Sequence, residues 1–366
     1  MAPIPTRRSP SQRAQRALAR AAGDRRLVAG TTVTAGAALA AGVARELLAR
    51  TDGNDAGGGA SRAYRIKRKE ELTEAIVRIA RGRVDDALEH LSEGLDRDVS
   101  SAVHEARKDL KKARAVVRLV RVPIGKSAYR RENARLHDAA RALSGSRDAE
   151  VKIETLEAIA ERAEEDLPEG FTAMRANLEK ERDGWVAEHD DGDSDLRRAA
   201  ELAAAEIAAA RDSISRWQFA SSGWALLEPG LKRSYRRGRK RFHETLADPS
   251  AENVHEWRKR VKDLWYHLRL LRDSWPETLS GMSDQAHELS DLLGDHHDLT
   301  VLGQDAQMRP ELAGDAAGLS AAKSLITDRQ RELMEAAVPI GERCYAESPK
   351  AFAKRLRTYW QAWRPD

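Results

Sequence analysis

The amino-acid sequence predicts an all-α fold in which one helical unit occurs twice, preceded by an N-terminal extension. From about Ala63 onward, apolar residues recur every three or four positions, which is the period of a helix with one buried face. Strand-like alternation is absent, and only 5% of the residues are aromatic, a composition that disfavours an all-β fold. With 366 residues the chain is long enough to bury a sizeable core.

The first predicted unit, residues 1–62, is a basic extension rich in alanine and glycine. It carries ten arginines against four acidic residues. Leu27–Ala44 has no charged residue, but it consists mostly of Ala, Gly and Thr, so we favour a soluble helix or tail over a membrane anchor. A membrane anchor remains the alternative. The Gly57-Gly58-Gly59 run marks a linker to the rest of the chain.

A duplicated motif divides the remaining chain into two halves, 63–220 and 221–366. The segment 103–111 (VHEARKDLK) matches the segment 254–262 (VHEWRKRVK) at an offset of 151 residues. Two weaker matches keep the same order: 81–83 with 237–239, and 143–148 with 293–298. We interpret the prolines after residue 120 as boundaries between helices; they are Pro123, Pro168, Pro229, Pro249, Pro276, Pro310, Pro339 and Pro349.

On a helix, each copy of the motif separates an apolar stripe from a basic face. The basic faces contain His104, Arg107, Lys108, Lys111, Arg114 and Arg118 in the first copy, and His255, Arg258, Lys259, Lys262 and Arg269 in the second. A row of Lys and Arg is usually a solvated face with local ion pairs. Here few acidic residues are spaced to pair with these cations, and a histidine recurs at the same place, so we interpret both faces as anion-binding. The weaker matches add further candidate contacts: Arg81, Arg83, Arg147, Arg237, Arg239 and His297.

The charges are also segregated along the chain, although its formal net charge is only +4. Residues 104–135 carry eleven Lys or Arg against three acids, and residues 232–272 carry thirteen against five. If the two basic helices face each other across a two-fold axis, they pool their charge. The expected ligand is then a long, flexible polyanion rather than a small molecule.

The doubled His-x-x-Arg-Lys-x-x-Lys motif, followed in each copy by Leu-x-x-x-(Arg/His)-Asp, resembles the CHAD domain, the conserved histidine α-helical domain. The resemblance covers roughly residues 63–360. It implies two antiparallel helical bundles related by a pseudo-two-fold axis, and binding of inorganic polyphosphate by the two basic faces. Trp265 stands where Arg114 lies in the first copy, and His297 replaces Arg147. The acidic strand of the triphosphatases to which many relatives are fused is absent, so no such activity is transferred.

Three other functions compete with this interpretation. The His296-His297-Asp298 run, with His267 or His287 and Asp305, is similar to the ligand set of helical metal phosphohydrolases, but Arg147 in the first copy cannot bind a metal. Binding to a nucleic-acid backbone without sequence readout is the main alternative. A scaffold that recruits acidic proteins or polyphosphate granules is the third.

We therefore expect a non-catalytic polyphosphate-binding protein without metal or cofactor. The single cysteine, Cys344, excludes an intramolecular disulfide. This favours a cytoplasmic location. Association with polyphosphate granules is a further expectation. Protonation of His104 and His255 is expected to tighten binding as the pH falls.

Overall fold

The protein is built from helices, which confirms the predicted all-α class. The computed structural model describes residues 62–143, 148–160, 169–188 and 192–364. Its α-helices are α3 (Leu72–Glu89), α4 (Val99–Leu119), α5 (Lys126–Ala142), α6 (Asp148–Ala160), α7 (Glu169–Glu188), α8 (Gly192–Ile214), α9 (Glu228–Ala247), α10 (Ala251–Leu271), α11 (Pro276–Met308), α12 (Ala316–Cys344) and α13 (Pro349–Trp363). Short 3₁₀ or π segments occur at His90–Gly94, Gly223–Leu226, Arg272–Ser274 and Pro310–Ala313.

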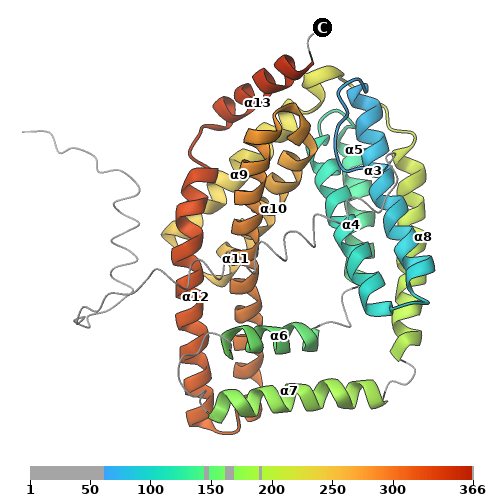
Figure 1. The fold of residues 1–366 in the computed structure, drawn as a ribbon. Coiled ribbons are helices and arrows are strands. Elements are labelled where there is room, and N and C mark those ends of the chain that lie inside the picture. Colours follow the sequence, from blue (N-terminus) through green and yellow to red (C-terminus); the bar gives the residue numbers. More distant parts are fainter. Residues whose placement is uncertain (1–61, 144–147, 161–168, 189–191, 365–366) are drawn as a thin grey trace, which may run out of the picture.

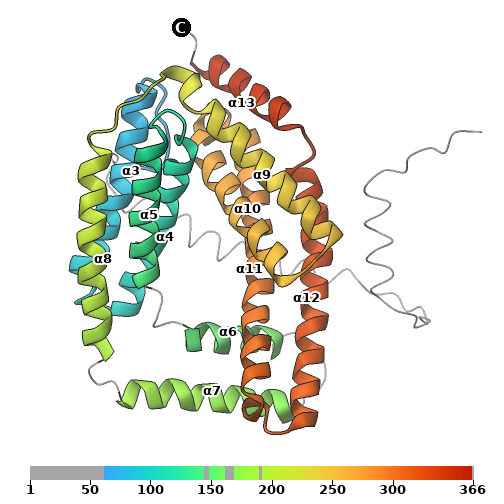
Figure 2. The same cartoon turned by 180° about the vertical axis from the view of Figure 1, so that it is seen from behind.

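These helices form two bundles that lie side by side (Figure 1). Helices α3, α4, α5 and α8 make one bundle, and α9 to α13 make the other. Helices α6 and α7 run across the lower end of the view and pack against α11 and α12. The view from behind shows α9 and α10 next to α4 (Figure 2), and both helices contact α4.

One hydrophobic core runs through both bundles. Val117 of α4 and Val261 of α10 belong to the same buried cluster. A second cluster contains Leu156 of α6, Phe171 of α7 and Leu302 of α11. Helices α6 and α7 belong to the first half by sequence, yet they pack on helices of the second half. The two-fold relation between the halves stays a prediction.

Local sequence explains where several helices begin. The Asp98 side chain accepts a hydrogen bond from the Ser101 amide at 3.0 Å and caps α4. Pro276 and Pro349 occupy the first turns of α11 and α13, where a proline costs no helical hydrogen bond. Pro339 lies inside α12, so its interpretation as a boundary was wrong. It is exposed, and water can replace the backbone hydrogen bond that it removes.

The two bundles meet where α4 contacts α10. Arg118 Nη1 of α4 lies 2.7 Å from Asp263 Oδ1, and Arg260 Nη1 lies 3.0 Å from Asp263 Oδ2. Asp263 is only 3% exposed, so one buried carboxylate bridges two guanidinium groups. His267 Nε2 lies 3.1 Å from the carbonyl oxygen of Ala115, and burial lowers the pKa of His267, which keeps the ring neutral and able to donate this bond.

Helix α9 approaches α4 so closely that a side chain cannot fit at their contact. A Cβ atom at Gly230 would lie 1.8 Å from the carbonyl oxygen of Leu119. Because the obstacle is backbone, a small rotamer change cannot relieve it. Gly230 therefore sets the distance between the first helix of the second half and the basic helix of the first half.

Replacing Gly230 by alanine should lower the free energy of unfolding by about 1–3 kcal/mol or more, because α9 must move away from α4. Urea denaturation measures this loss. Gly281→Ala on α11 is the matched control, since a Cβ there meets nothing within 4 Å and should stabilise the helix by about 0.5–1 kcal/mol. Equal stability of the two variants would contradict the close contact between α9 and α4.

Replacing Asp263 by alanine should lower the free energy of unfolding by about 3–5 kcal/mol, because buried Arg260 and partly buried Arg118 lose their shared counter-charge. Asp328→Ala provides the comparison on α12, where Asp328 and Arg331 form an exposed pair at 3.2 Å. This control should cost less than about 1 kcal/mol. Similar losses in both variants, measured by the same denaturation, would show that the junction does not depend on Asp263.

Candidate anion-binding surface

The fold brings the two predicted basic faces together at a pair of lysines. Lys111 of α4 and Lys262 of α10 hold the same position in the two motifs, and the positive charge of Lys111 acts on Lys262. Burial, followed by the charges of Arg258 and Lys111, lowers the pKa of Lys262 to about 7. Asp291 and Asp298 on α11 act in the opposite direction but leave this large net shift. An additional negative charge at this place would therefore be stabilised.

Two histidines extend this group onto α11. The rings of His255 and His297 lie 4.2 Å apart between centroids. Burial, with the nearby His297 and Lys259 as smaller causes, lowers the pKa of His255 to about 4. The pKa of His297 is lowered by burial and by Arg258. Both rings are thus neutral at neutral pH. We call Lys111, His255, Arg258, Lys262 and His297 the cationic junction.

Several nitrogens of the predicted contacts are buried without an acceptor among the described residues. They are Nδ1 of His255, Nε of Arg258 and Nε of Arg114. A buried donor without an acceptor is costly, and a phosphate oxygen would supply one. Arg114 is also short of negative charge, because burial and then Arg118 lower its pKa to about 10.

Gly294 of α11 gives the Arg258 side chain its space. A Cβ atom at Gly294 would lie 3.1 Å from Arg258 Nη2, closer than side chains normally pack. Sequence analysis missed this role, although a glycine inside a helical segment was a signal for a close contact. It also missed that Asp291 and Asp298 face Lys262.

Lys108 and Lys259 lie beside the junction and already have partners. Lys108 Nζ is 2.8 Å from Glu105 Oε1, and Lys259 Nζ is 2.7 Å from Glu256 Oε1. The expectation that the basic faces lack helical partners is therefore wrong for these two lysines. The same (i, i+3) pair recurs in both motifs and moderates their charge.

The last basic residue of each face along the sequence, Arg118 in α4 and Arg269 in α10, packs toward the protein interior. Arg118 is held by Asp263 at the contact between the bundles. Arg269 is buried, and its guanidinium carbon lies 5.8 Å from the ring centroid of Tyr64 and 5.4 Å from that of Trp265. His104 and Arg107 are partly exposed on α4, on the same side as Lys111.

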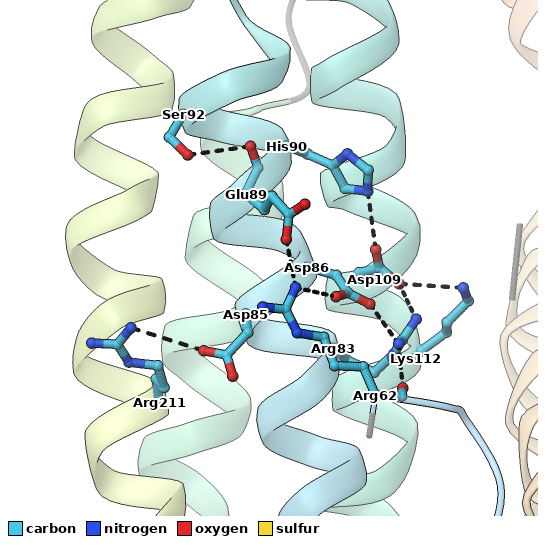
Figure 3. A network of polar contacts seen from close by, with 10 residues as sticks. All are labelled: Arg62, Arg83, Asp85, Asp86, Glu89, His90, Ser92, Asp109, Lys112 and Arg211. Atoms are coloured by element: carbon cyan, nitrogen blue, oxygen red, sulfur yellow. Dashed lines mark hydrogen bonds and ion pairs between the residues drawn. The ribbon is translucent and has the colours of Figure 1, made fainter. Parts of the chain in front are cut away.

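The additional candidates from the weaker repeats lie in other environments. Arg83 is 4% exposed; Figure 3 shows it between Asp86 and Asp109, whose oxygens it approaches at 2.5 and 3.0 Å. Its Nη2 also donates to the carbonyl of Arg62 at 2.6 Å. This network joins α3 to α4 and leaves Arg83 little capacity for a ligand. Arg81 is exposed on α3 and lines a different cavity.

On α9, Arg237 is exposed, and its charge acts on Arg260 behind the junction. Arg239 Nε donates to the carbonyl of Tyr345 at 3.2 Å. Arg147 lies outside the described residues. The ligand contacts of all these residues stay predictions.

The proposed metal ligands do not come together. His267 faces the Ala115 carbonyl, whereas Asp305 contacts Lys152 at 2.7 Å and Arg309 at 2.5 Å near α6. In the part of the chain that the structure describes, no group of three or more His, Cys, Asp or Glu side chains is placed to hold a metal ion.

The candidate membrane segment, Leu27–Ala44, lies outside the described residues. Of the helices that the structure describes, none combines the length and the apolar character needed to cross a membrane.

Comparison with known proteins connects this fold to a family. The family model of the CHAD domain matches residues 78–307. The chain is also similar to the crystal structure of the CHAD domain from the plant Ricinus communis, with a TM-score of 0.49 and 15% sequence identity over 82% of this chain and 96% of that chain. No curated protein matches the sequence. Because the family model spans most of the described chain, including both copies of the basic motif, the protein belongs to the CHAD domain family.

Proposed function

We propose that the protein binds inorganic polyphosphate at the cationic junction and does not hydrolyse it. The observation that carries this proposal is the pairing of Lys111 and Lys262 from two helices 151 positions apart. Burial, followed by repulsion from Arg258 and Lys111, lowers the pKa of Lys262 to about 7. A bound chain of phosphates would remove this repulsion and restore the charge of Lys262.

The donors of the junction suit phosphate oxygens. The guanidinium of Arg258 presents several N–H groups in a planar fork, and Lys111 and Lys262 add mobile point charges. His255, which is neutral, can donate one hydrogen bond without a second positive charge. His104 and Arg107 would continue the contacts along α4, so a polymer would gain more than a single phosphate ion.

Binding to a nucleic-acid backbone is the competing function, because it uses the same phosphate chemistry. Base stacking needs exposed aromatic rings, and Trp265 is the aromatic residue within the basic face. Its ring packs against His287, with centroids 4.0 Å apart, and against Tyr266, at 4.7 Å. This packing favours polyphosphate. A cytoplasmic location with granule association forms part of the same proposal.

Charge reversal at both lysines should weaken polyphosphate binding about 100-fold or more, because like charges in contact cost several kcal/mol. The variant is Lys111→Glu/Lys262→Glu, and isothermal titration with long-chain polyphosphate measures the change. Arg331→Glu/Lys350→Glu reverses two exposed charges on α12 and α13 and should lose less than about threefold.

Competition between polyphosphate and nucleic acid at a fixed salt concentration tests which ligand the protein prefers. Polyphosphate should displace DNA and RNA. Preferential displacement of polyphosphate by nucleic acid, or equal losses in the two double variants, would refute the proposal. Phosphate release from the bound polymer would refute its non-catalytic part.

Affinity for polyphosphate should rise as the pH falls from about 9 to 7. Free Lys262 is charged only below about pH 7, and a polyanion raises its pKa towards the ordinary value of a lysine, so binding takes up a proton between these two values. Titration at pH 8 in buffers of different ionisation enthalpy measures this proton.

Lys262→Arg should remove the pH dependence, because arginine stays charged throughout this range. The sequence predicted that protonation of histidines would make binding tighter at lower pH. We assign the pH dependence in this range to Lys262 instead, because the pKa of His255 is near 4 in the free protein. An unchanged pH profile in Lys262→Arg would contradict this assignment.

A further inference from the structure

A second basic cavity lies outside the cationic junction. It occupies about 500 Å³ between α5 and the end of α8. Its wall includes Arg131, Arg135, Ser213 and Arg216, with Ile124 and Ala128 as apolar members. None of these residues belongs to the repeated motif.

A buried carboxylate positions part of this wall. Glu132 is completely buried, and its Oε1 accepts hydrogen bonds from Arg131 Nε at 2.8 Å and from Ser213 Oγ at 2.7 Å. Arg131 Nη2 donates to Ser213 Oγ at 3.0 Å. The guanidinium is therefore held through Nε and Nη2, and the Arg131 side chain is 45% exposed. A donor whose orientation is fixed in advance binds with a smaller loss of side-chain entropy.

The other two arginines are weakly compensated. Arg135 Nε lies 3.7 Å from a carboxylate oxygen of Glu206, whose side chain is 55% exposed. Its Nη1 reaches the Ala209 carbonyl only at 3.5 Å. Arg216 is exposed, and the described residues provide no ion pair for its side chain. Three arginines thus line one cavity, with Glu132 in contact with Arg131 and Glu206 farther from Arg135.

A neighbouring cavity also has arginines in its wall, but more carboxylates pair with them. It occupies about 740 Å³ on the α3 side of Trp217 and also has three arginines in its wall: Arg62, Arg78 and Arg81. There, Arg62 pairs with Asp86 and Glu89, and Arg78 pairs with Glu70. The cavity between α5 and α8 has two carboxylates beside its arginines, Glu132 and the more distant Glu206, against three in the neighbouring cavity.

We propose that the cavity between α5 and α8 binds a small phosphorylated molecule with an apolar group. Arg131, Arg135 and Arg216 would bind the phosphate oxygens, since arginine forks match their geometry. Ile124 and Ala128 would contact the apolar group. A volume of about 500 Å³ is typical of small-molecule sites. This site is separate from the cationic junction and does not depend on polyphosphate binding there.

Isothermal titration of the full chain with phenyl phosphate tests the proposal. We expect saturable binding to one site that weakens at least tenfold in Arg135→Gln/Arg216→Gln. Arg233→Gln/Arg236→Gln removes two exposed arginines on α9 and should bind as the unaltered protein does. Inorganic phosphate should bind more weakly than phenyl phosphate, and equal affinities would overturn the apolar part of the proposal.

Measuring each ligand on the variant of the other site distinguishes the two sites. Lys111→Glu/Lys262→Glu should keep phenyl phosphate binding, and Arg135→Gln/Arg216→Gln should keep polyphosphate binding. Loss of phenyl phosphate binding in the junction variant alone, or absence of saturable binding, would overturn the second site. Circular dichroism checks the fold, and the single variant Arg216→Glu, at an exposed residue, must also lose binding.

Discussion

The contact between α4 and α10 decides both the fold and the proposed function. At this contact, Asp263 pairs with both Arg118 and Arg260 and holds the bundles together. At the same contact, the charges of Lys111 and Arg258 act on Lys262, which is also buried. The charges that stabilise the contact and the charges proposed to bind the ligand therefore lie on the same pair of helices. On α10 the two groups of charged residues are less than two helical turns apart. Packing energy from the shared core offsets the repulsion between the lysines.

This arrangement explains why the free protein keeps part of its site uncharged. Buried cations that lack a counter-charge lose their proton more readily, and Lys262 and His255 both show lowered pKa values. Asp291 and Asp298 reduce the effect without removing it. The site would gain charge on binding, so its empty state is less repulsive than the number of basic residues suggests.

The all-α class followed from periodicity, and the match between segments 103–111 and 254–262 identified the two basic helices. Those patterns depend on local helix geometry, which a sequence displays directly. The ion pair of Arg118 with Asp263 joins residues 145 positions apart, and no local pattern reveals it. The lowered pKa of Lys262 depends on which charges surround it after folding. From the sequence, all the basic residues of the motif have the same predicted role in anion binding. In the folded protein, Arg118 and Arg269 contribute to the interior, whereas Lys111 and Lys262 lie at the cationic junction.

The position of α6 and α7 against α11 and α12 has a consequence for synthesis. Lys152 of α6 pairs with Asp305, and Asn177 of α7 donates to the Leu312 carbonyl, 153 and 135 positions later. A ribosome thus produces α6 and α7 well before the helices that cover their apolar sides. Until then, Leu156 and Phe171 must remain unprotected or be shielded by a chaperone. Such distant contacts also slow folding, so a chain truncated before α11 would expose an aggregation-prone surface.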